Sequence, residues 1–213
     1  MHSLIPLLLL GLTASIDFPS PASATPEGEK IPHVLVLGDS LSAGFGLKRS
    51  DAYPALLSEK AAATGQRLHM VNAGVSGDTT AGGLRRLPDL LDHRVDVLIL
   101  ELGINDAFQS VPVPQIEANL QAIITLTKRR YPEVRIVIAG MQLPQKPGED
   151  YLTAFGAMFP ELASRNDAAL IPFLLRGVAG DPALNQADLL HPNARGQKIL
   201  AANVWPILET ALQ

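Results

Sequence analysis

The sequence contains no cysteine, few aromatic residues and little excess charge. Without cysteine, the chain can form no disulfide, no thiolate nucleophile and no cysteine-ligated metal or iron–sulfur site. Its formal net charge of −4 indicates no basic surface of the kind that binds nucleic acid, so we expect no nucleic-acid partner. Aromatic residues make up 5% of the chain and Trp205 is its only tryptophan, which argues against a platform for stacking sugars.

Long hydrophobic runs are also missing. The apolar segment 4–12 is too short to span a bilayer, which takes a helix of about 20 residues. It is followed by Ala22-Ser23-Ala24, a pattern typical of signal-peptide cleavage. The sequence therefore predicts a signal peptide over residues 1–24 cleaved after Ala24, a linker over 25–32, a periplasmic or secreted location, and no stable membrane anchor after cleavage. Because no Lys or Arg precedes the apolar segment, an uncleaved apolar tail or anchor is the alternative.

From residue 33 onward, strand-like apolar runs alternate with segments of helical periodicity. Continuous Val and Leu runs are typical of parallel strands that are buried on both faces. The runs predict strands over residues 33–37, 68–72, 95–102, 134–139 and 169–174. Apolar residues at helical spacing predict helices over residues 51–64, 79–91, 114–130, 151–165 and 193–212. This alternation predicts one domain over 33–213, a three-layer α/β/α structure with a parallel sheet of about five strands.

Residues that can do chemistry follow the predicted strands. Ser40 comes after the first strand, Gly77 after the second and Asn105 after the third. Asp188 and His191 lie between the fifth strand and the last helix. Because ligands of open α/β sheets bind at the carboxyl ends of the strands, we expect these residues at one edge of the sheet.

Ser40, His191 and Asp188 form a candidate catalytic triad. A serine hydroxyl becomes a good nucleophile when a histidine oriented by a carboxylate takes its proton. We therefore predict Ser40 as nucleophile, His191 as general base and Asp188 as the orienting carboxylate. Taken separately, Asp188 could be a helix cap and His191 a surface turn residue. A metal site on these two residues lacks a further His or Glu cluster to complete a coordination shell, so we expect no metal.

Acyl transfer also needs donors for the oxyanion of the tetrahedral intermediate. The backbone N–H groups of Ser40 and Gly77 and the side-chain amide of Asn105 are the candidates. Glycine allows close backbone approach and asparagine offers two N–H donors, although both are also common turn residues. We expect Asp39 and Asp106 to stabilise loops by accepting backbone hydrogen bonds.

Four blocks of this sequence resemble the SGNH branch of the GDSL hydrolases. They are Gly38-Asp39-Ser40-Leu41-Ser42, Gly77, Gly103-x-Asn105-Asp106 and Asp188-x-x-His191. The sequence is most similar to the bacterial periplasmic thioesterase, lysophospholipase and arylesterase group of that family. The resemblance implies a flavodoxin-like sheet, a Ser-His-Asp triad, a three-donor oxyanion hole formed by Ser40, Gly77 and Asn105, and no metal or organic cofactor.

The resemblance also implies hydrolysis of carboxylic ester or thioester bonds in small acyl substrates such as aryl esters, acyl thioesters and lysophospholipids. We expect a monomer in which Phe108, Leu143 and Pro144 contact the acyl group. Three further apolar residues would suit such a groove: Phe155, Met158 and Phe159. Residues 104 and 107–110 depart from that group, where a second glycine and a glycine-containing loop are usual, so the acyl-chain preference stays open.

Two other functions are compatible with parts of the sequence. A carbohydrate O-acetyl esterase would use the same residues on a different ester. A non-catalytic flavodoxin-like module could bind a phosphate with the glycine-rich loop 38–46. That loop has no Lys or Arg before Lys48, and this alternative leaves Asp188 and His191 unexplained.

Overall fold

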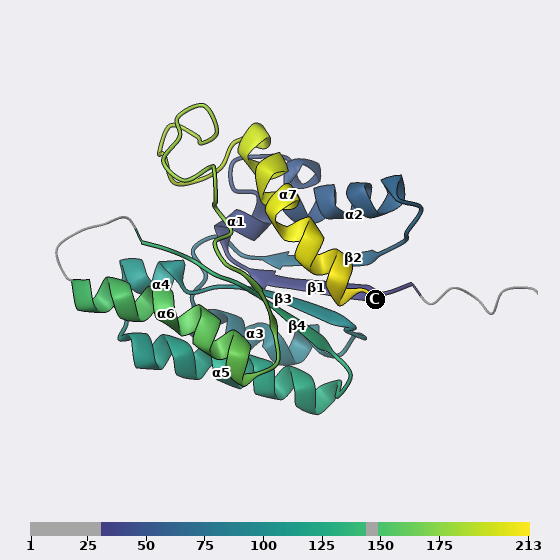
Figure 1. Ribbon diagram of the computed structural model, residues 1–213, viewed down its shortest axis with the longest axis horizontal. Helices are drawn as coiled ribbons and strands as arrows, with labels where there is room; N and C mark the ends of the chain where they lie inside the picture. The colour runs from purple at the N-terminus through teal and green to yellow at the C-terminus, as the bar shows by residue number, and fades with distance from the viewer. Residues whose placement is uncertain (1–30, 144–148) are drawn as a thin grey trace, which may run out of the picture. The chain divides into compact units, whose positions relative to one another are not determined.

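The computed structural model describes residues 31–143 and 149–213. The predicted signal peptide, the linker up to residue 30, and Pro144 lie outside the described residues. Within the described part, five parallel strands form one sheet in the order β2-β1-β3-β4-β5 (Figure 1). The strands are β1 (His33–Gly38), β2 (His69–Gly74), β3 (Val97–Glu101), β4 (Arg135–Ala139) and β5 (Ala169–Ile171).

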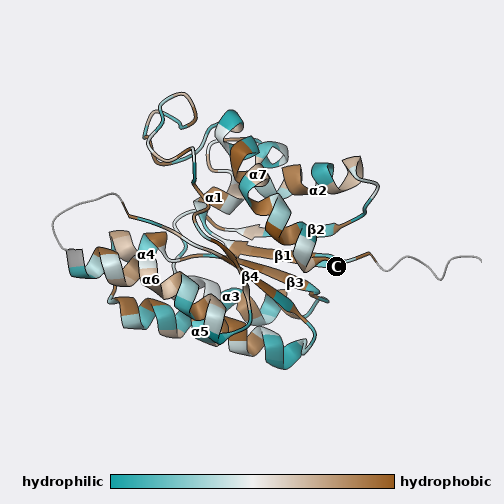
Figure 2. Cartoon of the chain, viewed as in Figure 1, coloured by the Kyte–Doolittle hydropathy of each residue, from teal (hydrophilic) through white to brown (hydrophobic). Residues whose placement is uncertain are grey.

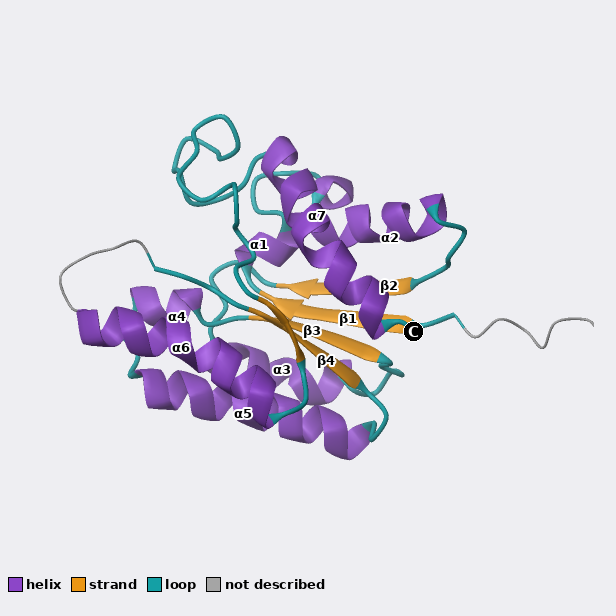
Figure 3. Ribbon diagram, in the orientation of Figure 1, coloured by secondary structure: helices purple, strands orange, loops and turns teal. Residues whose placement is uncertain are grey.

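Helices cover both faces of this sheet (Figure 3). One face is covered by α2 (Tyr53–Ala63) and α7 (Ala194–Ala211), with the short α1 (Ser40–Ala43) nearby. The other is covered by α3 (Thr80–Leu90), α5 (Val113–Arg130) and α6 (Glu149–Arg165). A 3₁₀ turn (Arg49–Asp51) precedes α2, and α4 (Ile104–Phe108) follows β3. The predicted three-layer α/β/α fold is confirmed.

The core lies between the sheet and its two helical layers. All five residues of the central β3 are buried, and so are the last five of β1, because helices cover both faces of these strands. In Figure 2 the central strands are hydrophobic, and the helices carry hydrophilic residues as well as hydrophobic ones. Helix α5 shows why its spacing predicted a helix, since four residues of one stripe are 0–1% exposed: Ile116, Leu120, Ile123 and Ile124.

The structure corrects the sequence prediction at the end of β5 and at two short helices, α1 and α4. Strand β5 ends at Ile171 rather than at residue 174, because Pro172 has no N–H for the sheet. The helices α1 and α4 were not predicted, since four or five residues are too few to show a helical period. Within the described residues, no helix is both long and apolar enough to cross a membrane.

The strand order places the loops that follow β1, β2 and β3 beside one another. Strand β1 lies between β2 and β3, and Gly38 at its end is in register with Gly74 on one side and Glu101 on the other. The chain therefore leaves β1, β2 and β3 at neighbouring points on one edge of the sheet.

Candidate active site

Ser40 is the first residue of α1, directly after β1. Asp39 caps this short helix, because its Oδ1 accepts the N–H of Leu41 at 2.9 Å. This bond fixes the turn on which Ser40 sits, as expected for an aspartate that stabilises a loop. Ser40 is 8% exposed, so the hydroxyl lies in the wall of the site rather than on an open surface.

A buried carboxylate, Glu101, supports this turn from below. Its Oε2 accepts the Ser42 hydroxyl at 2.5 Å and the Asp39 N–H at 3.1 Å, and Tyr53 Oη lies 2.8 Å from Ser42 Oγ. Burial, followed by the neighbouring Asp39, raises the pKa of Glu101 well above its usual value. A Cβ on Gly38 would overlap the side chains of Ser42 and Glu101, so this position requires glycine.

His191 joins Ser40 to Asp188. Its Nε2 lies 3.0 Å from Ser40 Oγ, and its Nδ1 lies 2.7 Å from Asp188 Oδ2. The second oxygen of Asp188 accepts the backbone N–H groups of Leu190 and His191, both at 3.0 Å. The pKa of Asp188 is lowered to about 2, first by the His191 N–H and then by the His191 side chain. An ionised Asp188 favours the tautomer in which Nδ1 is protonated and Nε2 accepts the Ser40 hydroxyl.

The loop that carries this pair is folded on itself. Gln186 donates its backbone N–H to the His191 carbonyl at 2.8 Å, and Asn185 forms an isolated antiparallel bridge with Pro192. Leu189 takes a positive φ of 59° at the tip. The two backbone contacts close the loop so that Asp188 and His191 project from one tight turn.

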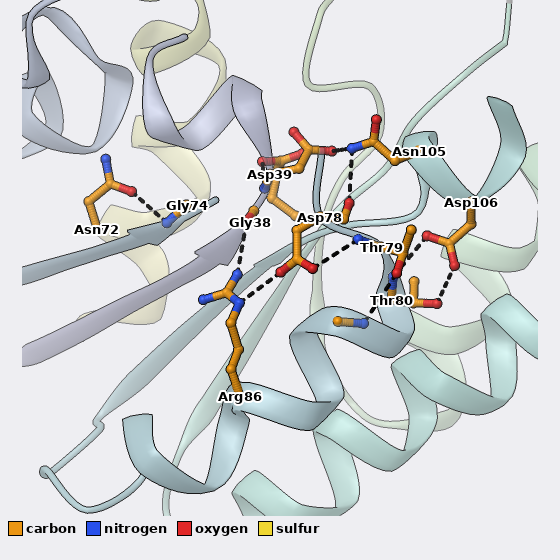
Figure 4. A network of polar contacts seen from close by, with 12 residues as sticks. Gly38, Asp39, Asn72, Gly74, Asp78, Thr79, Thr80, Arg86, Asn105 and Asp106 are labelled. Carbon is orange, nitrogen blue, oxygen red and sulfur yellow. Dashed lines mark hydrogen bonds and ion pairs between the residues drawn. The ribbon is translucent and has the colours of Figure 1, made fainter. Parts of the chain in front are cut away.

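Asn105, on α4 after β3, reaches across to the loops after β1 and β2 (Figure 4). Its Nδ2 donates to the Asp78 carbonyl at 2.9 Å and to Asp39 Oδ2 at 3.2 Å. Burial raises the pKa of Asp39 to about 6. Among residues 31–143 and 149–213, the backbone N–H groups of Ser40 and Gly77 donate to no backbone acceptor outside the helices and strands.

Gly77 is fixed by its neighbours in a tight turn. Val75 donates its N–H to the Gly38 carbonyl at 3.1 Å, and Asp78 donates back to the Val75 carbonyl at 3.1 Å. Gly77 takes a φ of 79°, which favours glycine. The structure thus brings this loop to the end of β1, beside the loop that carries Ser40.

Asp106 stabilises the start of α3 and takes no part in the triad geometry. Its carboxylate is 1% exposed and accepts both the N–H of Thr80 at 2.8 Å and the Thr80 hydroxyl at 2.6 Å (Figure 4). Asn119 on α5 donates to the same hydroxyl at 3.0 Å. The expectation that Asp106 accepts backbone hydrogen bonds agrees with this geometry.

Comparison with known proteins places the chain in a family. A model of the GDSL-like lipase/acylhydrolase family matches residues 36–199. The chain belongs to this family. It is 39% identical to esterase TesA of Pseudomonas aeruginosa over 84% of this chain and 89% of that protein. It is 38% identical to thioesterase 1/protease 1/lysophospholipase L1 of Escherichia coli, covering 79% of each. The crystal structure of TesA superposes with a TM-score of 0.80 at 38% identity, over 84% of this chain and 99% of that one. Like these relatives, this GDSL-family protein is an ester hydrolase.

Two residues of this GDSL hydrolase that contact the His191 loop were missed by sequence reasoning. The Phe45 ring lies 4.5 Å from the His191 ring, centroid to centroid, at an angle of 39°. Gln186 donates its side-chain amide to the Phe45 carbonyl at 2.6 Å. Phe45 lies within the glycine-rich loop after Ser40, and an aromatic residue between Gly44 and Gly46 was the one signal that the sequence offered.

The residues that we expected to contact the acyl group differ in their exposure. Phe108 at the end of α4 is 55% exposed, and Leu143 after β4 is half-buried. Pro144 lies outside the described residues. The prediction was wrong for three residues of α6, which pack in the core with 0–1% of their surface exposed: Phe155, Met158 and Phe159.

Other acidic and histidine residues of the described part form no group of three or more that could bind a metal ion. Asp188 and His191 instead share a hydrogen-bonded chain with Ser40.

Proposed function

We propose that this GDSL hydrolase is a serine esterase in which Ser40 attacks the carbonyl carbon of carboxylic esters and thioesters. One observation carries this proposal. Ser40 Oγ, His191 and Asp188 form a continuous chain of hydrogen bonds, with 3.0 Å and 2.7 Å between the bonded atoms. This is the geometry in which an imidazole can accept the serine proton while a carboxylate stabilises the resulting imidazolium.

The reaction then proceeds in two halves. His191 Nε2 takes the Ser40 proton as Ser40 Oγ bonds to the carbonyl carbon, and the same proton passes to the departing alcohol or thiol as the acyl-enzyme forms. A water molecule next loses a proton to His191 and attacks the acyl-enzyme. Ser40 regains its proton as the carboxylic acid leaves.

In this proposal the oxyanion binds to the N–H groups of Ser40 and Gly77 and to Asn105 Nδ2. Asn105 keeps its 2.9 Å bond to the Asp78 carbonyl and exchanges its longer, 3.2 Å contact with Asp39 for the oxyanion. Donors that are already oriented gain strength in a site from which water is excluded.

An acyl chain is the substrate portion that the surroundings favour. Of the seven large apolar side chains that are exposed in the described residues, five follow β1, β2 and β3 or lie in the His191 loop: Phe45, Val75, Phe108, Leu189 and Leu190. Contact between an acyl chain and exposed apolar side chains removes apolar surface of both from water, which favours binding. We therefore propose aryl esters, acyl thioesters and lysophospholipids as substrates, with Phe108, Leu143 and Pro144 contacting the acyl group.

For the cellular context, we propose that residues 1–24 are a signal peptide removed after Ala24 and that 25–32 are a linker. The domain 33–213 then acts in the periplasm, or as a secreted protein, as a monomer without a membrane anchor. The A-x-A pattern at residues 22–24 supports this.

The test is a substrate panel with purified protein and its Ser40→Ala variant. The panel contains p-nitrophenyl esters of increasing chain length, an acyl-CoA, a lysophospholipid and an acetylated glycan. We expect hydrolysis of aryl esters and thioesters by the wild type, and none by Ser40→Ala with an unchanged circular dichroism spectrum. Wild-type turnover by Ser40→Ala would overturn the mechanism, and activity confined to acetyl groups on the glycan would overturn the substrate class.

A further inference from the structure

Arg86 on α3 and Asp78, which directly follows Gly77, form a partly buried ion pair (Figure 4). Arg86 Nε lies 2.7 Å from Asp78 Oδ2, and the two side chains are 23% and 11% exposed. A second nitrogen of the same guanidinium, Nη2, donates to the Gly38 carbonyl at 3.0 Å. Arg86, on α3, therefore contacts the loop after β2 and the end of β1 at once.

Asp78 itself is bound on all sides. Its Oδ1 accepts the N–H of Thr79 at 3.0 Å, and its backbone carbonyl accepts Asn105 Nδ2 at 2.9 Å. A Cβ on Gly82 would overlap the Asp78 carboxylate, so the first turn of α3 leaves room for this carboxylate because glycine stands there. The contacts with Thr79, Asn105 and Arg86 thus hold Asp78 in place, and Arg86 is the one among them with the opposite charge.

The segments that Arg86 and Asp78 contact carry all three proposed oxyanion donors. Gly77 precedes Asp78 directly, and Asn105 is bound to the Asp78 carbonyl. Ser40 follows two residues after Gly38, whose carbonyl accepts from Arg86. One guanidinium therefore connects the segments that carry all three donors, although it contacts none of the donor groups itself.

We propose that Arg86, acting through Asp78, is a positioning residue for the oxyanion hole of this enzyme. The inference rests on the proposed function, since it assigns a role within that site. The two parallel contacts require the planar, forked guanidinium, and a lysine ammonium cannot supply both in the same geometry.

The first experiment measures kcat and KM for p-nitrophenyl butyrate hydrolysis by Arg86→Gln, Arg86→Lys and Asp78→Asn, with Arg85→Gln as the matched control. Arg85 is the neighbouring residue on α3 and is exposed. Loss of one oxyanion donor lowers turnover by roughly 10²–10³, and displacing donors should cost part of that. We expect kcat to fall by about 10–100-fold in the three variants, with KM changed by less than about threefold, and no change in Arg85→Gln.

The second experiment separates positioning from mere stabilisation. Arg86→Gln is combined with Asn105→Ala, and the loss of kcat caused by Arg86→Gln is measured in each background. If Arg86 positions Asn105, its substitution should cost less than about threefold once Asn105 is already removed, because coupled residues are not additive. An equal loss in both backgrounds, or a kcat of Arg86→Gln within twofold of wild type, would overturn the proposal.

Two controls keep the outcomes distinct. Melting temperatures identify any variant that loses activity through unfolding, and Arg86→Lys, which keeps the charge, carries the same test if Arg86→Gln does not fold. Failure of the proposed function would show differently, as retained activity in Ser40→Ala. Failure of the positioning role would leave Ser40→Ala inactive and Arg86→Gln fully active.

Discussion

The proposed active site has two sides, one that carries the proposed acid–base pair and one that carries the proposed oxyanion donors, and they are built in different ways. On the acid–base side, Asp188 and His191 are three residues apart, and both their contacts with each other and the turn that carries them lie within one partly exposed loop. On the oxyanion side, Asn105 bonds to residues 27 and 66 positions away, and Asp39 and Glu101 are fully buried. The acid–base pair is local, whereas the proposed oxyanion donors are held by contacts with distant segments that include the buried Asp39.

This difference separates effects on turnover from effects on stability. A substitution in the acid–base loop should remove activity and leave the fold unchanged. A substitution among the buried groups of the oxyanion side should change both, because those groups also join α1, α3 and the sheet.

Substitution of His191 by alanine should have the largest effect on activity. Ser40 then has no base, and loss of a triad serine or histidine lowers kcat by on the order of 10⁶. Steady-state hydrolysis of p-nitrophenyl butyrate measures the loss, and the melting temperature should stay within about 2 °C of wild type. A large fall in melting temperature would contradict the local character of this loop.

Asp188→Asn and Asn105→Ala compare the two sides directly. Asp188→Asn disturbs the imidazole tautomer and should lower kcat by about 10⁴. Asn105→Ala removes one oxyanion donor and should lower kcat by about 10²–10³. The same assay with matched melting curves checks both. If Asn105→Ala proved the more damaging to turnover, the assignment of roles would be wrong.

Asp106→Ala should act on stability first. It leaves the buried N–H and hydroxyl of Thr80 without their acceptor, which costs about 1–3 kcal/mol in free energy of unfolding. For a domain of this size, each kcal/mol corresponds to about 2–4 °C in melting temperature. Asp89→Ala, an exposed position on α3, is the control and should melt like wild type.

The two sides should also respond to pH in opposite senses. Burial raises the pKa of Asp39 to about 6 and that of Glu101 well above its usual value, so the folded chain binds these protons more tightly than the unfolded chain. The free energy of unfolding should therefore fall as pH rises from about 4 through 6 and beyond. The pKa of Asp188 is lowered to about 2, so its contribution is present above about pH 4 and is lost as pH falls toward 2.

Glu101→Gln tests the part of the pH dependence of stability that comes from the buried carboxyl groups of Asp39 and Glu101. The glutamine can still accept the Ser42 hydroxyl and the Asp39 N–H through its amide oxygen. It removes one of the two neighbouring buried carboxyl groups, Asp39 and Glu101, that titrate. We expect its melting temperature to depend less steeply on pH between 4 and 8 than that of wild type. Glu161→Gln, an exposed position, should leave the slope unchanged. An equal slope in all three proteins would refute the assignment.

The sequence patterns predicted the fold more completely than they predicted the residues that surround the candidate site. Buried parallel strands are continuous apolar runs, so the order of elements and the position of Ser40 after β1 followed directly. The pattern of apolar side chains in a helix does not reveal whether they face a groove or the core. For this reason Phe155, Met158 and Phe159 on α6 were wrongly expected to line an acyl groove. Arg86 contacts Asp78, 8 residues away, and Glu101 contacts residues 59 and 62 positions away. No local spacing in the sequence predicts such pairs.

The most direct test of the central claim is mass-spectrometric mapping of the residue modified by a fluorophosphonate probe in the folded, full-length chain. The triad geometry predicts one phosphonyl group on the peptide that contains Ser40, formed at a rate that parallels loss of esterase activity, and no labelling in Ser40→Ala. Labelling of a different serine, or full esterase activity after stoichiometric labelling of Ser40, would contradict the account.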